Sequence, residues 1–187
     1  MTLLATDAVV LHLFDYRETS RIVRLVTRDA GLVSVVARGA RRPKNRFGAA
    51  LDLFASGVAQ VALHATGDLH GLNAFDAVHS RATIAASLDR FGAANAVAEL
   101  CLRFGQGHES AEVFAAAVRA LDAIAVAEGG RVHASALGAA WRLVAAFGFT
   151  PALEQCAACH EAIAPEADVT FHHRAGGALC ARCARNA

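Results

Sequence analysis

The sequence has little net charge, no long hydrophobic run and no recognisable leader segment. Its 18 Lys+Arg and 17 Asp+Glu residues give a net charge of +1, which excludes a polycation that coats nucleic acid with its whole surface. Its apolar runs are broken by charge or glycine well short of the roughly 20 residues that a membrane span requires. The first residues form neither a basic segment nor a long apolar one, so we expect no secretory signal and a cytoplasmic protein.

The sequence also lacks the motifs of several enzyme classes. It contains no phosphate-cradling GxxxxGK[ST], no HExxH of zinc peptidases and no GxSxG of hydrolases. Its acidic residues are scattered, with no pair that would mark a two-metal nuclease. A nuclease assembled from dispersed carboxylates is an alternative that no pattern supports. We therefore expect a binding protein with no catalytic residues.

The first part of the chain has the pattern of short strands. A length of 187 residues and a hydrophobic content of 55% suffice for one ordinary domain, or two or three small ones, with a buried core. Strands are predicted over residues 9–14, 22–27, 32–37, 58–63 and 69–75, with a hairpin turn at Thr66-Gly67-Asp68. Because closure removes exposed sheet edges, we expect a small barrel such as an OB-fold; a compact open sandwich is the alternative.

From about residue 80, apolar residues recur at spacings of three and four, which indicates amphipathic helices. Helices are predicted over 83–104 and 110–128, with Ser110 as the N-cap of the second, and a third is predicted to end at Gly148. The expected buried stripes comprise Ile84, Leu88, Phe91, Ala94, Val97, Cys101 and Phe104 in the first helix, and Leu137, Trp141, Val144 and Phe147 in the third. Cys101 is expected to be a core thiol and not a nucleophile, and Trp141 a core residue.

A basic segment interrupts the predicted barrel. Five of the 18 Lys+Arg residues, with no Asp or Glu among them, fall between residues 38 and 46: Arg38, Arg41, Arg42, Lys44 and Arg46. Gly39 and Pro43 indicate an exposed turn. Arginine forks bind phosphate oxygens, and Phe47 at the edge of the loop is expected to offer a face for base stacking. We predict a nucleic-acid site here. The alternative is a solvated loop whose charges serve only to hydrate the surface.

Four cysteines form the most specific motif of the chain. Cys156 and Cys159 make one CxxC pair, and Cys180 and Cys183 make a second, with 20 residues between the pairs. Four thiolates at this spacing complete the tetrahedron of a structural zinc and leave no open coordination site, so we expect one structural Zn²⁺ per chain. Redox chemistry of a CxxC pair is the competing interpretation. Between the pairs, His160, His172 and His173 could substitute as ligands but are expected to lie on the surface.

These motifs, taken with the sequences around them, resemble one known family. The matching segments are Asp15-Tyr16-Arg17-Glu18-Thr19-Ser20-Arg21, residues 27–44, residues 141–151 and the first CxxC pair, in the family's order and spacing. By these segments the whole chain resembles the bacterial recombination mediators of the RecO family. In the basic segment, Asn45 stands where family members often have Ser, a change that would keep a hydrogen-bonding side chain near the phosphates.

The resemblance implies a fold of class α+β with three parts. These are an OB-fold that binds single-stranded DNA over residues 1–80, a helical domain over 81–150 and a four-cysteine zinc knuckle over 151–187. It further implies ATP-independent annealing of complementary strands and a role in loading RecA. The implied partners are RecR and the C-terminal tail of single-stranded-DNA-binding protein, in the cytoplasm at the bacterial nucleoid. A zinc-containing, sequence-specific DNA-binding regulator and a thiol oxidoreductase are the alternatives.

Overall fold

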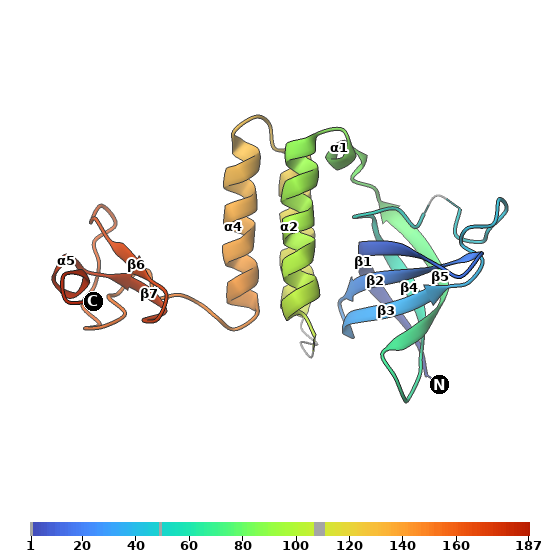
Figure 1. The fold of residues 1–187 in the computed structure, drawn as a ribbon, viewed down its shortest axis with the longest axis horizontal. Helices are drawn as coiled ribbons and strands as arrows, with labels where there is room; N and C mark the ends of the chain where they lie inside the picture. The colour runs from blue at the N-terminus through green and yellow to red at the C-terminus, as the bar shows by residue number, and fades with distance from the viewer. Residues whose placement is uncertain (1, 49, 107–110) are drawn as a thin grey trace. The chain divides into compact units, whose positions relative to one another are not determined.

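The structure, a computed structural model, describes residues 2–48, 50–106 and 111–187. The chain forms two compact units, residues 1–147 and residues 148–187. The first unit contains a β-barrel and a group of helices, and the second contains a small two-stranded sheet with one short helix (Figure 1). The predicted α+β fold class is confirmed. The boundaries at residues 80 and 150 stay a prediction.

Five strands close into a barrel in the order β1-β2-β3-β5-β4. The strands are β1 Thr2–Tyr16, β2 Ser20–Thr27, β3 Gly31–Ala37, β4 Ser56–Leu63 and β5 Leu69–His79. All neighbours are antiparallel except β3 and β5, which pair in parallel. The predicted hairpin at residues 66–68 joins β4 and β5, and the OB-like barrel is confirmed in place of the open sandwich.

Alternation along the strands explains why this sequence forms a barrel. In β3, Val33, Val35 and Ala37 are buried while the residues between them are half-buried, as expected of a strand with one face in a core. β1 pairs with β4 through its first half and with β2 through its second, and its register shifts between Val10 and His12. This irregularity bends β1, so that one long strand pairs with both β4 and β2 and closes the barrel.

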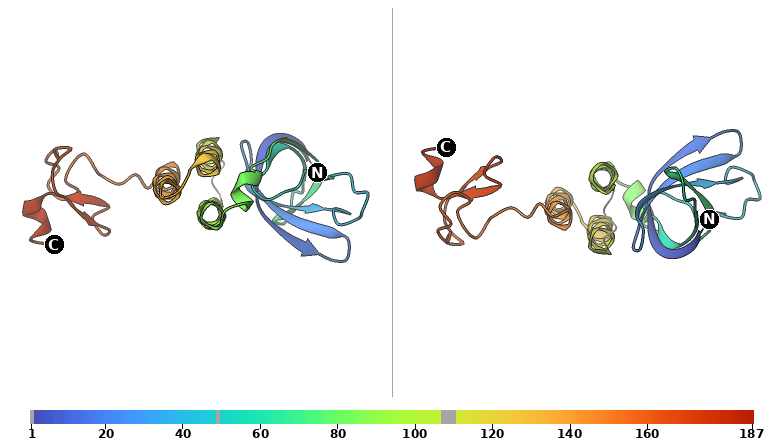
Figure 2. Two further views of the ribbon diagram at one scale, coloured as in Figure 1. Left: turned by 90° about the horizontal axis from the view of Figure 1, so that it is seen from above. Right: turned by 90° about the horizontal axis from the view of Figure 1, so that it is seen from below.

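The helices of the first unit are α1 Ala82–Ala85, α2 Leu88–Phe104, α3 Ala111–Val126 and α4 Arg131–Ala146. The predicted helix 83–104 is interrupted before α2, where Ser87 adopts an extended conformation and its side chain accepts a hydrogen bond from the Arg90 N–H. Helix α3 packs against α2, α4 and the barrel strands β1, β2 and β3. Figure 2 shows the three long helices end-on beside the barrel. The predicted cap Ser110 lies outside the described residues.

Two of the predicted buried stripes are partly wrong. In α2, Ala94, Val97 and Cys101 are buried as expected, but Leu88 is 86% exposed and the rings of Phe91 and Phe104 are also exposed. In α4 the buried residues are Val132, Ala139 and Leu143, whereas Leu137 is 63% exposed and Trp141 is 40% exposed. Small side chains let the helix backbones approach closely, so alanine and not the bulky residues occupies much of the contact.

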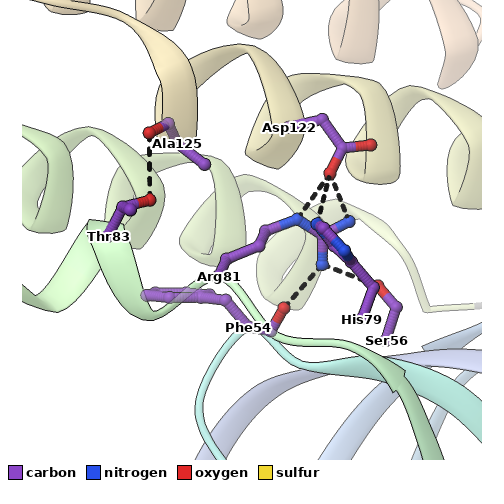
Figure 3. A network of polar contacts seen from close by, with 7 residues as sticks. All are labelled: Phe54, Ser56, His79, Arg81, Thr83, Asp122 and Ala125. Atoms are coloured by element: carbon purple, nitrogen blue, oxygen red, sulfur yellow. Dashed lines mark hydrogen bonds and ion pairs between the residues drawn. The ribbon is translucent and has the colours of Figure 1, made fainter.

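A buried arginine joins the barrel to the helices (Figure 3). The Arg81 side chain is 1% exposed, and its Nε and Nη2 each lie 2.7 Å from Asp122 Oδ1 in α3. Its Nη1 donates to the Phe54 carbonyl oxygen at 2.7 Å and to Ser56 Oγ at 2.6 Å. Nearby, Thr83 Oγ1 donates to the Ala125 carbonyl oxygen. Apolar residues of the barrel, Val9, Leu11, Val26 and Phe54, belong to the same core cluster as the helices.

The second unit is a small ribbon. Strands β6 Thr170–His172 and β7 Gly177–Leu179 pair in antiparallel fashion, and helix α5 Ala181–Ala184 follows. A bridge between Ala152 and Gly177 brings the start of the unit onto β7. A Cβ on Gly177 would lie 2.3 Å from the Ala152 carbonyl oxygen, so this close approach requires glycine.

None of the helices in the described part of the chain is long and apolar enough to span a membrane.

Candidate functional site

The basic loop, residues 38–47, is held in shape by its own hydrogen bonds. Gly39 adopts a φ of 76°, and the Arg42 N–H donates to the Gly39 carbonyl oxygen at 3.0 Å. The Asn45 side chain donates to the Arg42 carbonyl oxygen at 3.0 Å and accepts from the Phe47 N–H at 2.9 Å. Asn45 therefore shapes the loop, and its expected place near the phosphates stays a prediction.

Two adjoining hollows, of about 500 and 470 Å³, lie between this loop and the β4–β5 hairpin. Both are lined by Arg38, Gly39 and Arg42 on one side and by His64 and Gly71 on the other. We call the two hollows together the basic groove. Its cationic lining residues, all exposed, are Arg17, Arg38, Arg42, Lys44 and Arg46. No acidic residue is among the described residues that line it, so the groove presents an uncompensated positive field.

Arg41, the fifth residue of the predicted set, does not line the basic groove. Its Nε lies 3.4 Å from Asp15 Oδ2, and its Nη1 donates to the Glu18 carbonyl oxygen at 3.3 Å. Arg21 pairs with the other oxygen of Asp15. The charge of Arg41 is therefore partly compensated, and its side chain ties the basic loop to the β1–β2 turn.

The prediction that Phe47 offers a stacking face is wrong. The Phe47 side chain is 4% exposed and belongs to the barrel core. The Arg46 guanidinium lies 4.9 Å from the centroid of its ring, and Arg46 Nη2 also donates to the Leu72 carbonyl oxygen at 3.0 Å. Because the ring is buried in this core, no base can stack on it.

Sequence reasoning missed the second wall of the groove. Pairing of β3 with β5 places Val35 opposite His70 and Val36 opposite Gly71, which brings the β4–β5 hairpin beside the start of the basic loop. Arg17 of the β1–β2 turn, with a φ of 54°, lines the same groove. The local sequence around these residues carries no nucleic-acid motif. The signal that could have found them is the fold, since the β1–β2 and β4–β5 loops flank the ligand face of OB-folds.

The four cysteines of the second unit converge on one point. The Sγ atoms of Cys156, Cys159, Cys180 and Cys183 all lie within 4.8 Å of one another. Those of Cys159 and Cys180 are 3.8 Å apart. Four sulfurs at the usual Zn–S distance in a tetrahedron would be about 3.8 Å apart, so the cluster has the dimensions that a metal ion needs. His160, His172 and His173 are not members of the cluster.

Backbone bonds position these sulfurs and favour the thiolate form of Cys156. The His160 N–H donates to the Cys156 carbonyl oxygen at 2.8 Å, which closes the turn of the first pair. The Cys180 N–H donates to Cys156 Sγ at 3.4 Å, and this bond contributes most to lowering the pKa of Cys156 to about 6. Hydrogen bonding with Cys159 raises the pKa of Cys183 to about 12. Because four adjacent thiolates repel, the cluster could hold a metal ion that compensates them.

The fifth cysteine is unrelated to this cluster. Cys101 is fully buried among the helices, and burial raises the pKa of its thiol to about 12. The expectation of a core thiol is confirmed.

Comparison with known proteins identifies the family. The family model for the N-terminal part of recombination protein O matches residues 1–81, and the model for its C-terminal part matches residues 85–187. A protein of Anaeromyxobacter sp. (strain Fw109-5), named DNA repair protein RecO, is 37% identical over 97% of this chain and 70% of its own length. A second of that name, from Anaeromyxobacter sp. (strain K), is 38% identical over 94% of this chain and 68% of its own length. The chain therefore belongs to the RecO family of DNA repair proteins.

Proposed function

We propose that this chain is a recombination mediator that binds single-stranded DNA in the basic groove. The observation that carries the proposal is the set of exposed cations Arg17, Arg38, Arg42, Lys44 and Arg46, with no acid among the described residues that line the groove. Arginine and lysine neutralise phosphates and release condensed counterions, which supplies affinity without reading the sequence. A groove on an OB-like barrel suits one flexible strand.

The helices of this chain do not favour the sequence-specific regulator. A recognition helix needs an exposed face of basic and polar residues that can enter the major groove. Eight of the 16 residues of α3 are buried, and α5 beside the cysteine cluster has only 4 residues. Helices α2 and α4 carry two arginines each in sequences dominated by small and apolar residues.

We infer that binding serves ATP-independent annealing of complementary strands and assists RecA loading. Family membership supports this function in DNA repair, and the sequence contains no phosphate-cradling loop for ATP. The partners in this proposal are RecR, contacting the barrel, and the C-terminal tail of single-stranded-DNA-binding protein, contacting the helices. The protein would act as a binding module and not as an enzyme, in the cytoplasm at the bacterial nucleoid. Isothermal titration calorimetry with the tail peptide tests this partner, and absence of heat at high peptide concentration would remove it.

We further propose that Cys156, Cys159, Cys180 and Cys183 hold one structural Zn²⁺. Four sulfurs at tetrahedral spacing fill the coordination shell and leave no position for a substrate. A redox pair needs only two cysteines, so the convergence of both pairs favours the metal over the oxidoreductase. Structural zinc carries apparent binding free energies of about 10–16 kcal/mol in small peptides, enough to account for the folding of the second unit. Metal analysis of the purified protein should find one zinc per chain.

The experiment that tests DNA binding compares a labelled single strand with a duplex of the same sequence. We expect tighter binding of the single strand, falling with salt at a log–log slope of about −0.7 for each phosphate contact. An affinity that does not depend on the salt concentration, or that is higher for the duplex, would contradict the proposal.

A further inference from the structure

Two histidines form the wall of the basic groove opposite the basic loop. His64 follows β4 and is exposed, and His70 lies in β5 and is half-buried. Their rings are stacked, with centroids 6.2 Å apart and an angle of 26° between the planes. His64 lines both hollows of the groove, together with Arg38 and Arg42. A pair of flat rings therefore faces the cations that would hold the phosphates.

The backbone holds this pair in place before any ligand arrives. The His64 N–H donates to His70 Nδ1 at 3.2 Å, which fixes the orientation of the His70 ring. His70 is also anchored by its strand, since it lies opposite Val35 of β3. A ring that is already ordered loses little conformational freedom when a flat ligand stacks on it.

The other rings near the groove are less suited to receive a base. Phe47 is buried in the barrel core. Tyr16 lines the groove, but the Arg17 guanidinium lies 5.1 Å from the centroid of its ring. Cations alone bind any chain of phosphates, with or without bases, so preference for an intact nucleic acid requires a stacking surface.

We propose that the His64–His70 pair is the base-stacking platform of the basic groove. The ligand is then a single strand whose bases are present and unpaired, since a base in a duplex is already stacked on its neighbours. This inference rests on the proposed DNA binding and assigns the recognition of bases to residues outside the basic loop.

The experiment uses His64→Ala, which removes one ring but keeps the main-chain N–H that orients His70. Two probes of equal length are compared by fluorescence anisotropy: an oligothymidine strand and an abasic strand with the same sugar–phosphate backbone. We expect the full chain to bind oligothymidine at least fivefold more tightly than the abasic strand, because stacking contributes to the first only. His64→Ala should lose most of that preference, with unchanged affinity for the abasic strand and an unchanged salt slope.

Two further variants complete the test. His64→Phe keeps a ring at this position and should restore the preference for oligothymidine. His12→Ala is the matched control, because His12 is exposed on β1 beside Phe14 and does not line the groove. It should behave as the unsubstituted protein does.

The outcomes separate the two proposals. Equal binding of both probes by the unsubstituted protein would overturn the stacking platform and leave DNA binding intact. The same follows if His64→Ala weakens both probes alike, or neither, or if His64→Phe fails to rescue. Failure of the unsubstituted protein to bind either probe would overturn the proposed function, and the platform with it.

Discussion

Removing two cations from the basic groove should change the salt dependence of DNA binding by a calculable amount. The double variant Arg38→Ala, Arg42→Ala removes the two arginines that line both hollows. Both side chains are exposed, and neither takes part in an ion pair among the described residues. Folding should therefore hardly change, whereas every phosphate contact that the two residues make is lost.

The magnitude follows from counterion release. If the five cations of the groove each neutralise one phosphate, the log–log slope for a single strand is about −3.5, and the double variant should show about −2.1. Each phosphate contact raises the affinity at 0.1 M salt about fivefold relative to that at 1 M. Losing two contacts should therefore weaken binding at 0.1 M salt about 25-fold. Strands of different sequence should be weakened alike, because phosphate contacts do not read bases.

Fluorescence anisotropy over a range of salt concentrations measures both quantities. The matched control is Arg131→Ala, Arg142→Ala, which removes the same charge from exposed positions at the two ends of α4. It should leave the slope near that of the unsubstituted protein. If the groove variant keeps its slope, or if the control flattens equally, the strand does not follow the groove and the reasoning from charge placement is refuted.

Replacing Arg41 alone should flatten the slope by less than the same change at Arg42, because Asp15 already compensates its charge; equal effects would contradict this. Arg81→Ala should lower the free energy of unfolding of the first unit by about 3 kcal/mol in urea titrations, since it leaves the Phe54 carbonyl oxygen without its donor and removes the ion pair with Asp122; Arg81→Lys should lower it less, and an unchanged midpoint for Arg81→Ala would disprove the contribution. Chelation of the metal should unfold the second unit and make its four thiols reactive at pH 8, while Cys101 stays protected by its complete burial among the helices; a fifth fast thiol in a folded first unit would be inconsistent with that. Gly177→Ala should reduce metal content measured by atomic absorption, because its Cβ would meet the Ala152 backbone; full retention would show that the ribbon tolerates the shift.

The parts that the sequence predicts well are those governed by local pattern. Alternation in β3 and the turn at residues 66–68 locate strands, and paired CxxC spacing brings four sulfurs together. The basic loop is likewise predictable, because five cations fall between residues 38 and 46. In each case the relevant residues are close in sequence or obey a fixed spacing.

The parts that it predicts badly depend on contacts between distant segments. Phe47 looks exposed beside five cations, yet the barrel end that buries it is built from other strands. Trp141 looks like a core residue, yet α4 contacts its neighbours through small side chains. His64 and His70 become a groove wall only through the pairing of β3 with β5. Hydrophobic periodicity cannot assign such residues, because it identifies the apolar face of a helix or strand but not the segment that packs against that face.

The buried Arg81 has a consequence for how this protein can be divided. The two family models meet between residues 81 and 85, which suggests a natural place to cut the chain. A fragment ending at residue 80 would lose the guanidinium that binds the Phe54 carbonyl oxygen and Ser56. It would also expose to water the apolar barrel residues that pack against the helices, including Val9 and Leu11. An isolated barrel should therefore self-associate or unfold, so sequence homology and folding cooperativity divide this chain at different places.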